Sequence, residues 1–291
     1  MRVALVDLPL REHVEGWRGK NGFIDYLVEH PQTFGDPWRT VVMNELLESI
    51  DNDKIDEFTR WLKQERNILI ESSVDLQIQL VEHAVLLDRG PFISRMLDLT
   101  PGLRREMSRH KSSALIIALD YGNSHLIPLL TPIWPLPDDL PHAAGVGDFA
   151  KVQSYFDEAG RPVFGSLSHQ YPTNNPAFLR NLHWGQPTLQ HVLDMALAWA
   201  CVNRNLEIAT FLVDHGANVN TNWSTHEPAS ILHECAVHEN YEAAKFLIDH
   251  GIDMTILDYR WNATAQGWAR YAAGNEAMAD FLANAEHARK A

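Results

Sequence analysis

The sequence Phe-Leu-Val-Asp-His-Gly occupies residues 211–216, and Phe-Leu-Ile-Asp-His-Gly returns 35 residues later at 246–251. After a further 35 residues, Phe281-Leu282 falls at the same phase. A fixed period of this length is typical of proteins built from stacked copies of one small unit. We therefore expect a repeat array whose clearest copies lie within residues 195–282.

Each of these copies contains two apolar stripes with helical spacing. Apolar residues at positions i, i+3 and i+4 form the buried face of an α-helix. The stripes of the second copy consist of Leu232, Cys235 and Ala236, followed by Ala243, Phe246 and Leu247. The pattern predicts an all-α fold in which every repeat is a pair of helices.

Pairs of apolar residues that end a second helix can be followed along most of the chain. Their successive spacings are 35, 33, 26, 56, 35 and 35 residues, so four of the six lie within two residues of one period. They predict an all-α solenoid of about seven degenerate repeats over residues 41–291. The pairs are Trp61-Leu62, Met96-Leu97, Leu129-Leu130, Tyr155-Phe156, Phe211-Leu212, Phe246-Leu247 and Phe281-Leu282.

Two segments do not follow this period. The long spacing exceeds the period by 21 residues, and the excess falls in residues 160–187, which are rich in Pro, Asn, Ser, His and aromatic residues. We interpret residues 157–190 as one loop insertion, because insertions in solenoids map to loops. Residues 1–40 are irregular and rich in turn residues. We expect them to form an N-terminal cap, since the end of a solenoid would otherwise expose an apolar face.

With these patterns the chain resembles the ankyrin-repeat family, whose repeat runs roughly T-P-L-H-x-A-A-x-x-G-H-x-E-V-V-x-L-L-L-x-x-G-A-x-x-N. The segment Ser-Ile-Leu-His-Glu-Cys-Ala at 230–236 is similar to the opening, and 242–251 is similar to the second helix. Residues 205–220 also match, and residues 264–275 match with one extra residue. The resemblance is closest over 195–283, looser over 113–156 and loosest over 43–100.

The resemblance implies that loops, called fingers, project between successive helix pairs. The first finger would be residues 217–229, the second finger 252–264, and the insertion after Phe156 an enlarged one. Gly216 and Gly251 follow second helices, where the chain must adopt a positive φ to leave the helix. His215 and His250 lie beside the helix C-terminus, where a positive ring would meet the negative end of the dipole. Members of this family characteristically bind protein partners on the concave surface made by fingers and first helices.

Composition narrows the classes of function. The net charge is −14, which disfavours binding to nucleic acid or to an anionic membrane and favours a basic partner. The same negative charge would equally keep the protein soluble. No run of about 18 apolar residues predicts a membrane span, and Asp7 interrupts the apolar N-terminus, which does not read as a signal peptide. The two cysteines, Cys201 and Cys235, occupy small apolar helix positions and predict buried free thiols in the cytoplasm.

The sequence offers no clear catalytic or metal site, despite 15 histidines. His233 and His238 resemble a zinc helix only superficially, because five residues place them about 140° apart around a helix. Neither a nucleophile with its base nor a dinucleotide-binding loop can be assigned by spacing. We therefore expect no metal and no cofactor, and the sequence favours a binding protein over an enzyme.

Candidate binding residues are the aromatic and histidine side chains of the insertion and fingers, because Trp and Tyr in loops are typical of binding hot spots. Two alternatives stay open for these side chains, namely packing of Trp223 on Trp261 to hold the long fingers together, and a small-molecule pocket. The candidates are Tyr171, His183, Trp184, Trp223, His226, Tyr259 and Trp261.

The sequence thus predicts a module that binds another protein on its concave and finger surface, as an inhibitor or neutralising partner. The first alternative is a small-ligand-binding protein or enzyme with a His- and aromatic-rich pocket under the 157–190 insertion. The second is a structural solenoid within a larger assembly.

Overall fold

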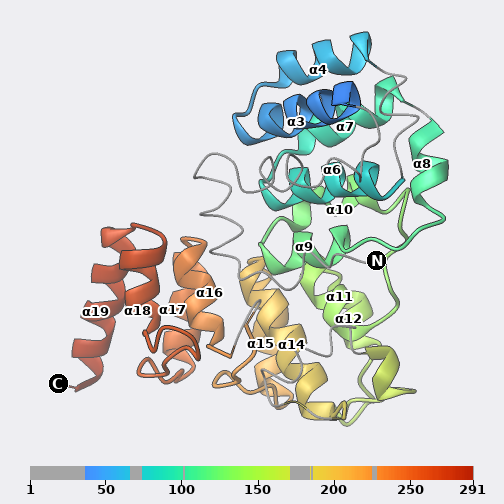
Figure 1. Cartoon of the computed structure of the whole chain (residues 1–291). Coiled ribbons are helices and arrows are strands. Elements are labelled where there is room, and N and C mark those ends of the chain that lie inside the picture. Colours follow the sequence, from blue (N-terminus) through green and yellow to red (C-terminus); the bar gives the residue numbers. More distant parts are fainter. Residues whose placement is uncertain are drawn as a thin grey trace. The chain divides into compact units, whose positions relative to one another are not determined.

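The computed structural model describes residues 37–65, 74–100, 102–170, 184, 186–224 and 228–290, and within these ranges the fold is helical without a β-strand (Figure 1). Two compact units are present. The first comprises Met1–Ala114 with Pro128–Trp134, and the second comprises Leu115–Ile127 with Pro135–Ala291. Of the predicted cap, only residues 37–40 are among those described, and they begin the first labelled helix.

The first unit contains α3 (Pro37–Asp51), α4 (Ile55–Gln64), α6 (Val74–Leu86), α7 (Gly90–Leu99) and α8 (Gly102–Met107). Large apolar side chains fill the space between the helix pairs, and the rings of Phe58 and Phe92 meet edge to face at 5.1 Å. Helix α8 was not predicted from the period. It is a short connecting helix held by the buried side chains of Leu103 and Met107.

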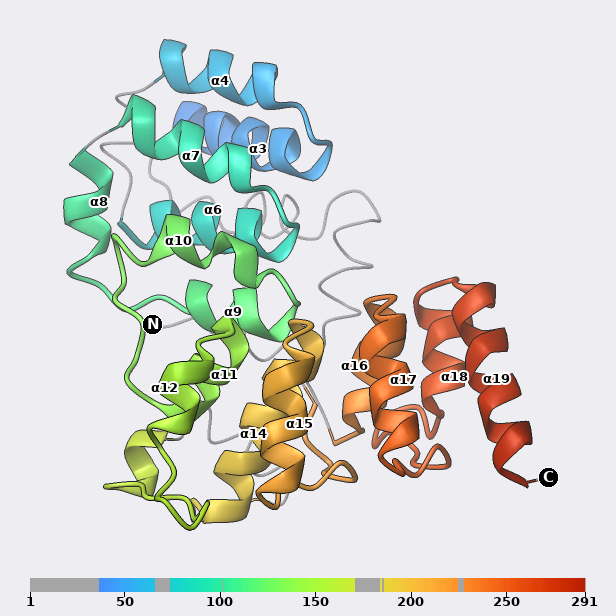
Figure 2. The ribbon, with the colours of Figure 1, turned by 180° about the vertical axis from the view of Figure 1, so that it is seen from behind.

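The second unit contains most of the array. Its helices follow one another as adjacent pairs from α14 to α19 (Figure 2). Helix α9 begins at the boundary with the first unit, and α10 returns to it. The elements of the second unit are α9 (Ala114–Asp120), η3 (Ser124–Leu126), α11 (Leu140–Val146), α12 (Phe149–Gln153), η4 (Leu167–Gln170), α14 (Leu189–Val202), α15 (Leu206–Asp214), α16 (Ile231–Val237), α17 (Tyr241–Asp249), α18 (Ala265–Gly267), η5 (Trp268–Ala272) and α19 (Glu276–Lys290). Helix α10 (Ile127–Leu130) belongs to the first unit except for its first residue.

The described residues form seven helix pairs, which confirms the predicted all-α repeat solenoid. In every pair, the residue that ends the turn between the two helices has a positive φ, between 52° and 81°. The amide of the next residue donates to a carbonyl five or six residues earlier, as in Asn240 N to Cys235 O at 2.9 Å. This turn closes the first helix and reverses the chain. The seven positions are Asp53, Asp88, Gly122, Gly147, Arg204, Glu239 and Gly274.

Only three of these seven positions carry glycine, so the other four hold a side chain in a left-handed conformation that costs about 1–2 kcal/mol. Glu239 has φ 52° and an exposed side chain. We expect Glu239→Gly to raise the free energy of unfolding by about 0.5–1 kcal/mol, since relief of this strain exceeds the added entropy of the unfolded chain.

Chemical denaturation of the whole chain measures this gain. Lys245→Gly, on the exposed face of α17, is the matched control, and we expect it to lower stability by about 1 kcal/mol because its position is helical. A loss of stability in both variants would contradict the proposed strain at Glu239.

Asparagine side chains tie successive repeats together. The Nδ2 of Asn240 donates to the carbonyl of Cys201 at 2.9 Å, while its Oδ1 accepts from Ala243 N at the start of α17. Asn205 makes the same kind of link, from its Nδ2 to the carbonyls of Ala144 and Gly145 at 3.0 and 2.8 Å. These side-chain amides bind carbonyls at the C-terminal ends of the preceding first helices, where the helix itself supplies no partner.

The last repeat contains one residue more than its neighbour, and the structure shows where that residue goes. Ser230 precedes Asn240 by ten residues, whereas Thr264 precedes Asn275 by eleven. Helix α18 continues into η5, a π-helix, and one π turn accommodates one additional residue within a helix. The flanking caps therefore keep their places in the repeat.

The fourth repeat is shorter than its neighbours, and helix α9 of the third repeat contacts helix α14 of the fifth repeat. Nδ2 of Asn203, which follows α14, donates to the carbonyl of Leu119 in α9 at 2.7 Å. Nε1 of Trp199 donates to Oδ1 of Asp120 at 2.7 Å. Helix α11 packs beside α14 as well, and the ring of His142 lies edge to face with Trp199 at 5.1 Å. Helix α14 therefore contacts two earlier first helices.

Candidate partner-binding surface

The predicted site residues fall into three groups in the structure. Tyr259 and Trp261 on the second finger are exposed, at 70% and 41%. Trp184 and Trp223 are buried, at 7% and 1% exposure. Tyr171, His183 and His226 lie outside the described residues. Only Tyr259 and Trp261 among the described candidates therefore present a large accessible surface.

Trp184 fixes the end of the insertion to the first finger. Its ring stacks on His191 of α14, with centroids 4.2 Å apart, and its Nε1 donates to Oδ1 of Asn222 at 2.9 Å. Burial lowers the pKa of His191, which favours the neutral ring in this stack. Trp184 thus supports the packing of the loop.

The first finger is anchored on α16. The indole of Trp223 is buried, and its Nε1 has no hydrogen-bond partner among the described residues. The hydroxyl of the adjacent Ser224 donates to Oε1 of Glu234 in the interior. Trp261, for which the sequence leaves packing on Trp223 open as an alternative, lies edge to face with Trp268, with centroids 5.7 Å apart.

The second finger is organised by a carboxylate that the sequence analysis did not single out. Asp258 is only 2% exposed. Its Oδ1 accepts from Arg260 N at 2.8 Å and Trp261 N at 2.6 Å. Its Oδ2 accepts from Ala263 N at 2.8 Å and Trp268 Nε1 at 3.0 Å. An Asp followed by Asn262 at positive φ is typical of a tight turn, which is the signal that could have identified this residue.

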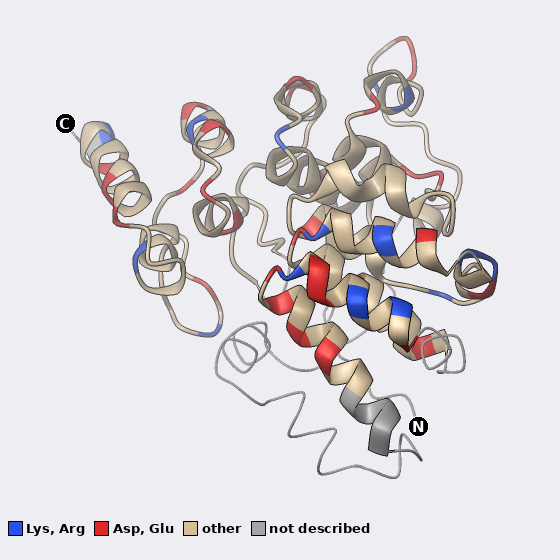
Figure 3. Cartoon of the chain, turned by 90° about the horizontal axis from the view of Figure 1, so that it is seen from above, with Lys and Arg blue, Asp and Glu red and all other residues tan. Residues whose placement is uncertain are grey.

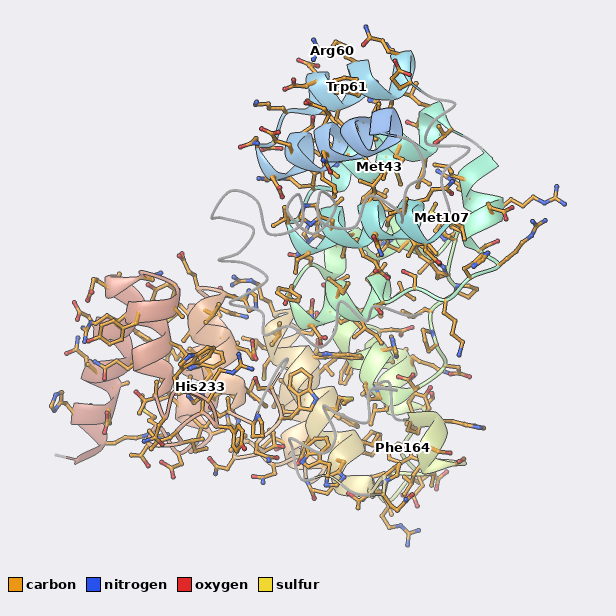
Figure 4. The ribbon with its side chains drawn as sticks, in the orientation of Figure 1. Met43, Arg60, Trp61, Met107, Phe164 and His233 are labelled. Atoms are coloured by element: carbon orange, nitrogen blue, oxygen red, sulfur yellow. The ribbon has the colours of Figure 1, made fainter. Side chains whose placement is uncertain are left out.

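The second finger is also joined to its neighbours. The amide of Tyr259 donates to the carbonyl of Pro228 in the first finger at 2.8 Å. Nε2 of His233 in α16 donates to the carbonyl of Ala263 at 3.1 Å, and its Nδ1 accepts from the Ser230 hydroxyl at 2.7 Å. These contacts join the backbone of the finger to the first finger and to α16, while the side chains of Tyr259 and Trp261 stay exposed. Figure 4 shows His233 among the side chains of this region.

Two first helices of the second unit, α9 and α16, carry the acidic groups Asp120 and Glu234. Burial raises the pKa of Asp120 to about 8; the Nε1–H of Trp199 lowers it, and the negative charge of Glu234 raises it further. Glu234 is 3% exposed and lies 4.0 Å from Nε2 of His238. The negative charge of Glu234, from a different repeat, thus disfavours ionisation of Asp120.

The histidines beside the glycines that end second helices have structural partners. Nδ1 of His215 donates to the carbonyl of Phe211 at 2.6 Å, and Nδ1 of His250 donates to that of Phe246 at 2.8 Å. Both rings cap the C-terminus of a second helix, and the glycines that follow them have φ of 97° and 86°.

No group of three or more His, Cys, Asp or Glu suited to a metal occurs among the described residues. Cys201 and Cys235 are buried free thiols. Burial raises the pKa of each, which opposes formation of a reactive thiolate. Within the described part of the chain, no helix combines the length and the apolar composition that crossing a bilayer requires.

Two further exposed apolar side chains belong to this end of the chain, and neither was predicted. Leu257 in the second finger is 47% exposed, and Tyr271 on η5 is 77% exposed. Tyr271 lies in a helix rather than a loop, so a search for aromatic residues in loops does not find it.

Acidic side chains occur on the helices of both units (Figure 3). The balance differs between the units, because the described residues of the second unit hold 18 Asp and Glu against 8 Lys and Arg. Among the described residues, acidic side chains therefore clearly outnumber basic ones in the unit that carries the exposed finger.

One segment of the second unit is similar to a known protein family. Residues 173–258 match the family model described as ankyrin repeats (3 copies). No curated protein matches the chain. Among solved structures, the ankyrin repeat domain of Bcl-3, described as a unique member of the IkappaB protein family, aligns at a TM-score of 0.31 and 16% identity, covering 82% of this chain and 97% of that one. The match to the family model shows that the chain contains ankyrin repeats, and the helix pairs outside the matched residues continue the same helical repeat pattern.

Proposed function

We propose that the chain is a protein-interaction module that binds a basic partner through the tip of its second finger. Ankyrin repeats generally mediate protein–protein interactions. The observation that carries the proposal is the tip itself, where Tyr259, Arg260 and Trp261 are consecutive and exposed. Trp, Tyr and Arg are the residue types most enriched at binding hot spots.

The charge of the second unit supports a partner with a basic surface. An excess of Asp and Glu creates a negative potential that speeds association with a cationic protein and disfavours anionic ones. A partner held in this way would have its own basic surface covered, which is how an inhibitor or neutralising protein acts. The buried free thiols fit a cytoplasmic setting.

The proposal is tested by capture of partners from the native cell extract on the immobilised full-length chain. We expect Tyr259→Ala/Trp261→Ala to abolish capture of the partner held by the wild type, because both anchors are removed. We also expect capture to weaken as salt is raised, since the charge attraction is screened.

Tyr271→Ala is the matched control, because it also removes an exposed aromatic ring and lies outside the finger. We expect it to capture the partner as the wild type does. Full capture by the double variant, with its thermal stability unchanged, would show that the tip is not the binding surface.

A second candidate function is small-ligand binding beside the insertion. His142 is 2% exposed, its Nδ1 donates to the carboxylate of Asp139 at 2.8 Å, and its Nε2 has no hydrogen-bond partner among the described residues. Gln170 of η4 lies nearby, since its Oε1 accepts from Leu140 N at 2.8 Å. A ligand held there would raise the thermal stability of the wild type more than that of His142→Phe, and equal shifts would count against this site.

A further inference from the structure

The second finger differs from the first at one buried position. Asp258 lies 35 residues after Trp223, so the two occupy equivalent places in successive repeats. Both are almost completely buried. The first finger places an indole at this position, whereas the second finger places a carboxylate there.

A buried carboxylate is stable only when hydrogen-bond donors surround it. Asp258 receives four N–H groups, three from the backbone of residues 260, 261 and 263 and one from Trp268. Burial raises the pKa of Asp258, but these donors outweigh it and lower the pKa below its usual range. The side chain is therefore ionised at neutral pH and binds its donors as a charged acceptor.

These hydrogen bonds determine the backbone of residues 258–263. The amide of Asp258 also donates to the carbonyl of Ala263 at 2.9 Å, which closes the loop at its base. Three of the six residues then have their amides fixed on one carboxylate, and the side chains of Tyr259, Arg260 and Trp261 extend from the exposed tip.

We infer that Asp258 is a positioning residue that holds Tyr259, Arg260 and Trp261 as a preformed recognition tip. The role in recognition rests on the function proposed above, whereas the order of the loop before binding does not. A loop that is already ordered loses little conformational entropy when a partner binds. The rigid rings of Tyr and Trp add contact area at small entropic cost.

Asp258→Asn in the full-length chain tests this inference. The amide retains one acceptor oxygen, while its NH₂ group faces N–H donors that it cannot bind. We expect hydrogen exchange at the amides of Arg260, Trp261 and Ala263 to become at least about tenfold faster, because the hydrogen bonds that protect them are weakened. We expect affinity for the captured partner to fall about tenfold.

Asp253→Asn is the matched control on the same finger. Asp253 is exposed and accepts from Thr255 N at 2.8 Å, without contact to the tip. We expect it to leave both exchange at residues 260–263 and partner capture unchanged. Trp268→Phe removes one of the four donors to Asp258 and gives a milder test if Asp258→Asn does not fold.

A double-mutant cycle separates positioning from general destabilisation. If Asp258 acts through the side chains of the tip, Asp258→Asn will cause a smaller loss of affinity in the Trp261→Ala variant than in the wild type, because one of the positioned side chains is already absent. Unchanged exchange in Asp258→Asn and Trp268→Phe would overturn the ordering role. Faster exchange with undiminished capture would overturn the positioning role. Absence of any partner for the wild type would refute the proposed function, while exchange alone would still decide whether Asp258 orders the loop.

Discussion

Trp223→Ala is expected to lower the free energy of unfolding by about 3–5 kcal/mol, the range for removing a large aromatic side chain from a packed interior. Trp223 is 1% exposed in the first finger, directly before Ser224, whose hydroxyl binds Glu234 of α16. Loss of the indole leaves a cavity beneath this anchor. Urea denaturation followed by circular dichroism measures the change.

Trp261→Ala provides the comparison, since both residues are finger tryptophans. Trp261 is 41% exposed, so its replacement removes less buried apolar surface. We therefore expect Trp261→Ala to lower the free energy of unfolding by about 1 kcal/mol. The two variants thus separate a packing tryptophan from a surface one. Equal destabilisation by both would mean that Trp261 is as much a part of the core as Trp223.

Asp120→Asn is expected to change the dependence of stability on pH. The pKa of Asp120 is raised from 3.8 to about 8 in the folded chain, chiefly by burial. The folded state therefore keeps a proton that the unfolded state releases above about pH 4. The wild type loses stability as pH rises from about 4 to about 8, by up to about 1.4 kcal/mol per pH unit from this group.

The amide introduced by this substitution would still accept the hydrogen bond from Trp199 without carrying a titrating proton. We therefore expect the variant to gain stability relative to the wild type as pH is raised, and to be similar to it near about pH 4. Asp214→Asn, an exposed carboxylate on α15, serves as the control. Parallel pH profiles for the wild type and Asp120→Asn would refute a raised pKa at this site.

The helix pairs could be predicted because each repeat obeys the same local rules. Apolar residues at i, i+3 and i+4 determine the buried faces of α16 and α17. Ser230 lies at the N-terminus of α16 and Asn240 at the N-terminus of α17. The turn positions were less visible in the sequence. A glycine in the sequence indicates the left-handed conformation at Gly122. Arg204 and Glu239 adopt the same positive φ although neither is a glycine.

Three features of the fold lay beyond the repeat pattern. Helix α8 is held by only two buried side chains, which give no recognisable period. The extra residue of the last repeat was visible, but a count of residues does not show that a π turn takes it up. The contact between α9 and α14 depends on the shortened fourth repeat, and contacts across repeats leave no trace in local spacing.

The sequence predicted that the candidate surface lies on the fingers, but it identified only some of the residues that are exposed there. Aromatic side chains in irregular loops have no periodicity that tells which of them point inward. In the sequence, Trp184 and Trp223 therefore cannot be distinguished from Trp261. In the structure, Trp184 is held by a hydrogen bond and by ring stacking, and both Trp184 and Trp223 are buried. The importance of Asp258 depends on four donors, one of them the indole of Trp268 ten residues along the chain.

The contact of α14 with both α9 and α11 alters how this array should unfold. In a simple solenoid each repeat touches only its neighbours, so unfolding can begin at an end and move inward one repeat at a time. Here the hydrogen bonds of Trp199 and Asn203 skip a repeat. Helices α9, α11 and α14 therefore share their stability and should melt as a single cooperative block, whereas the pair α18/α19 remains free to fray.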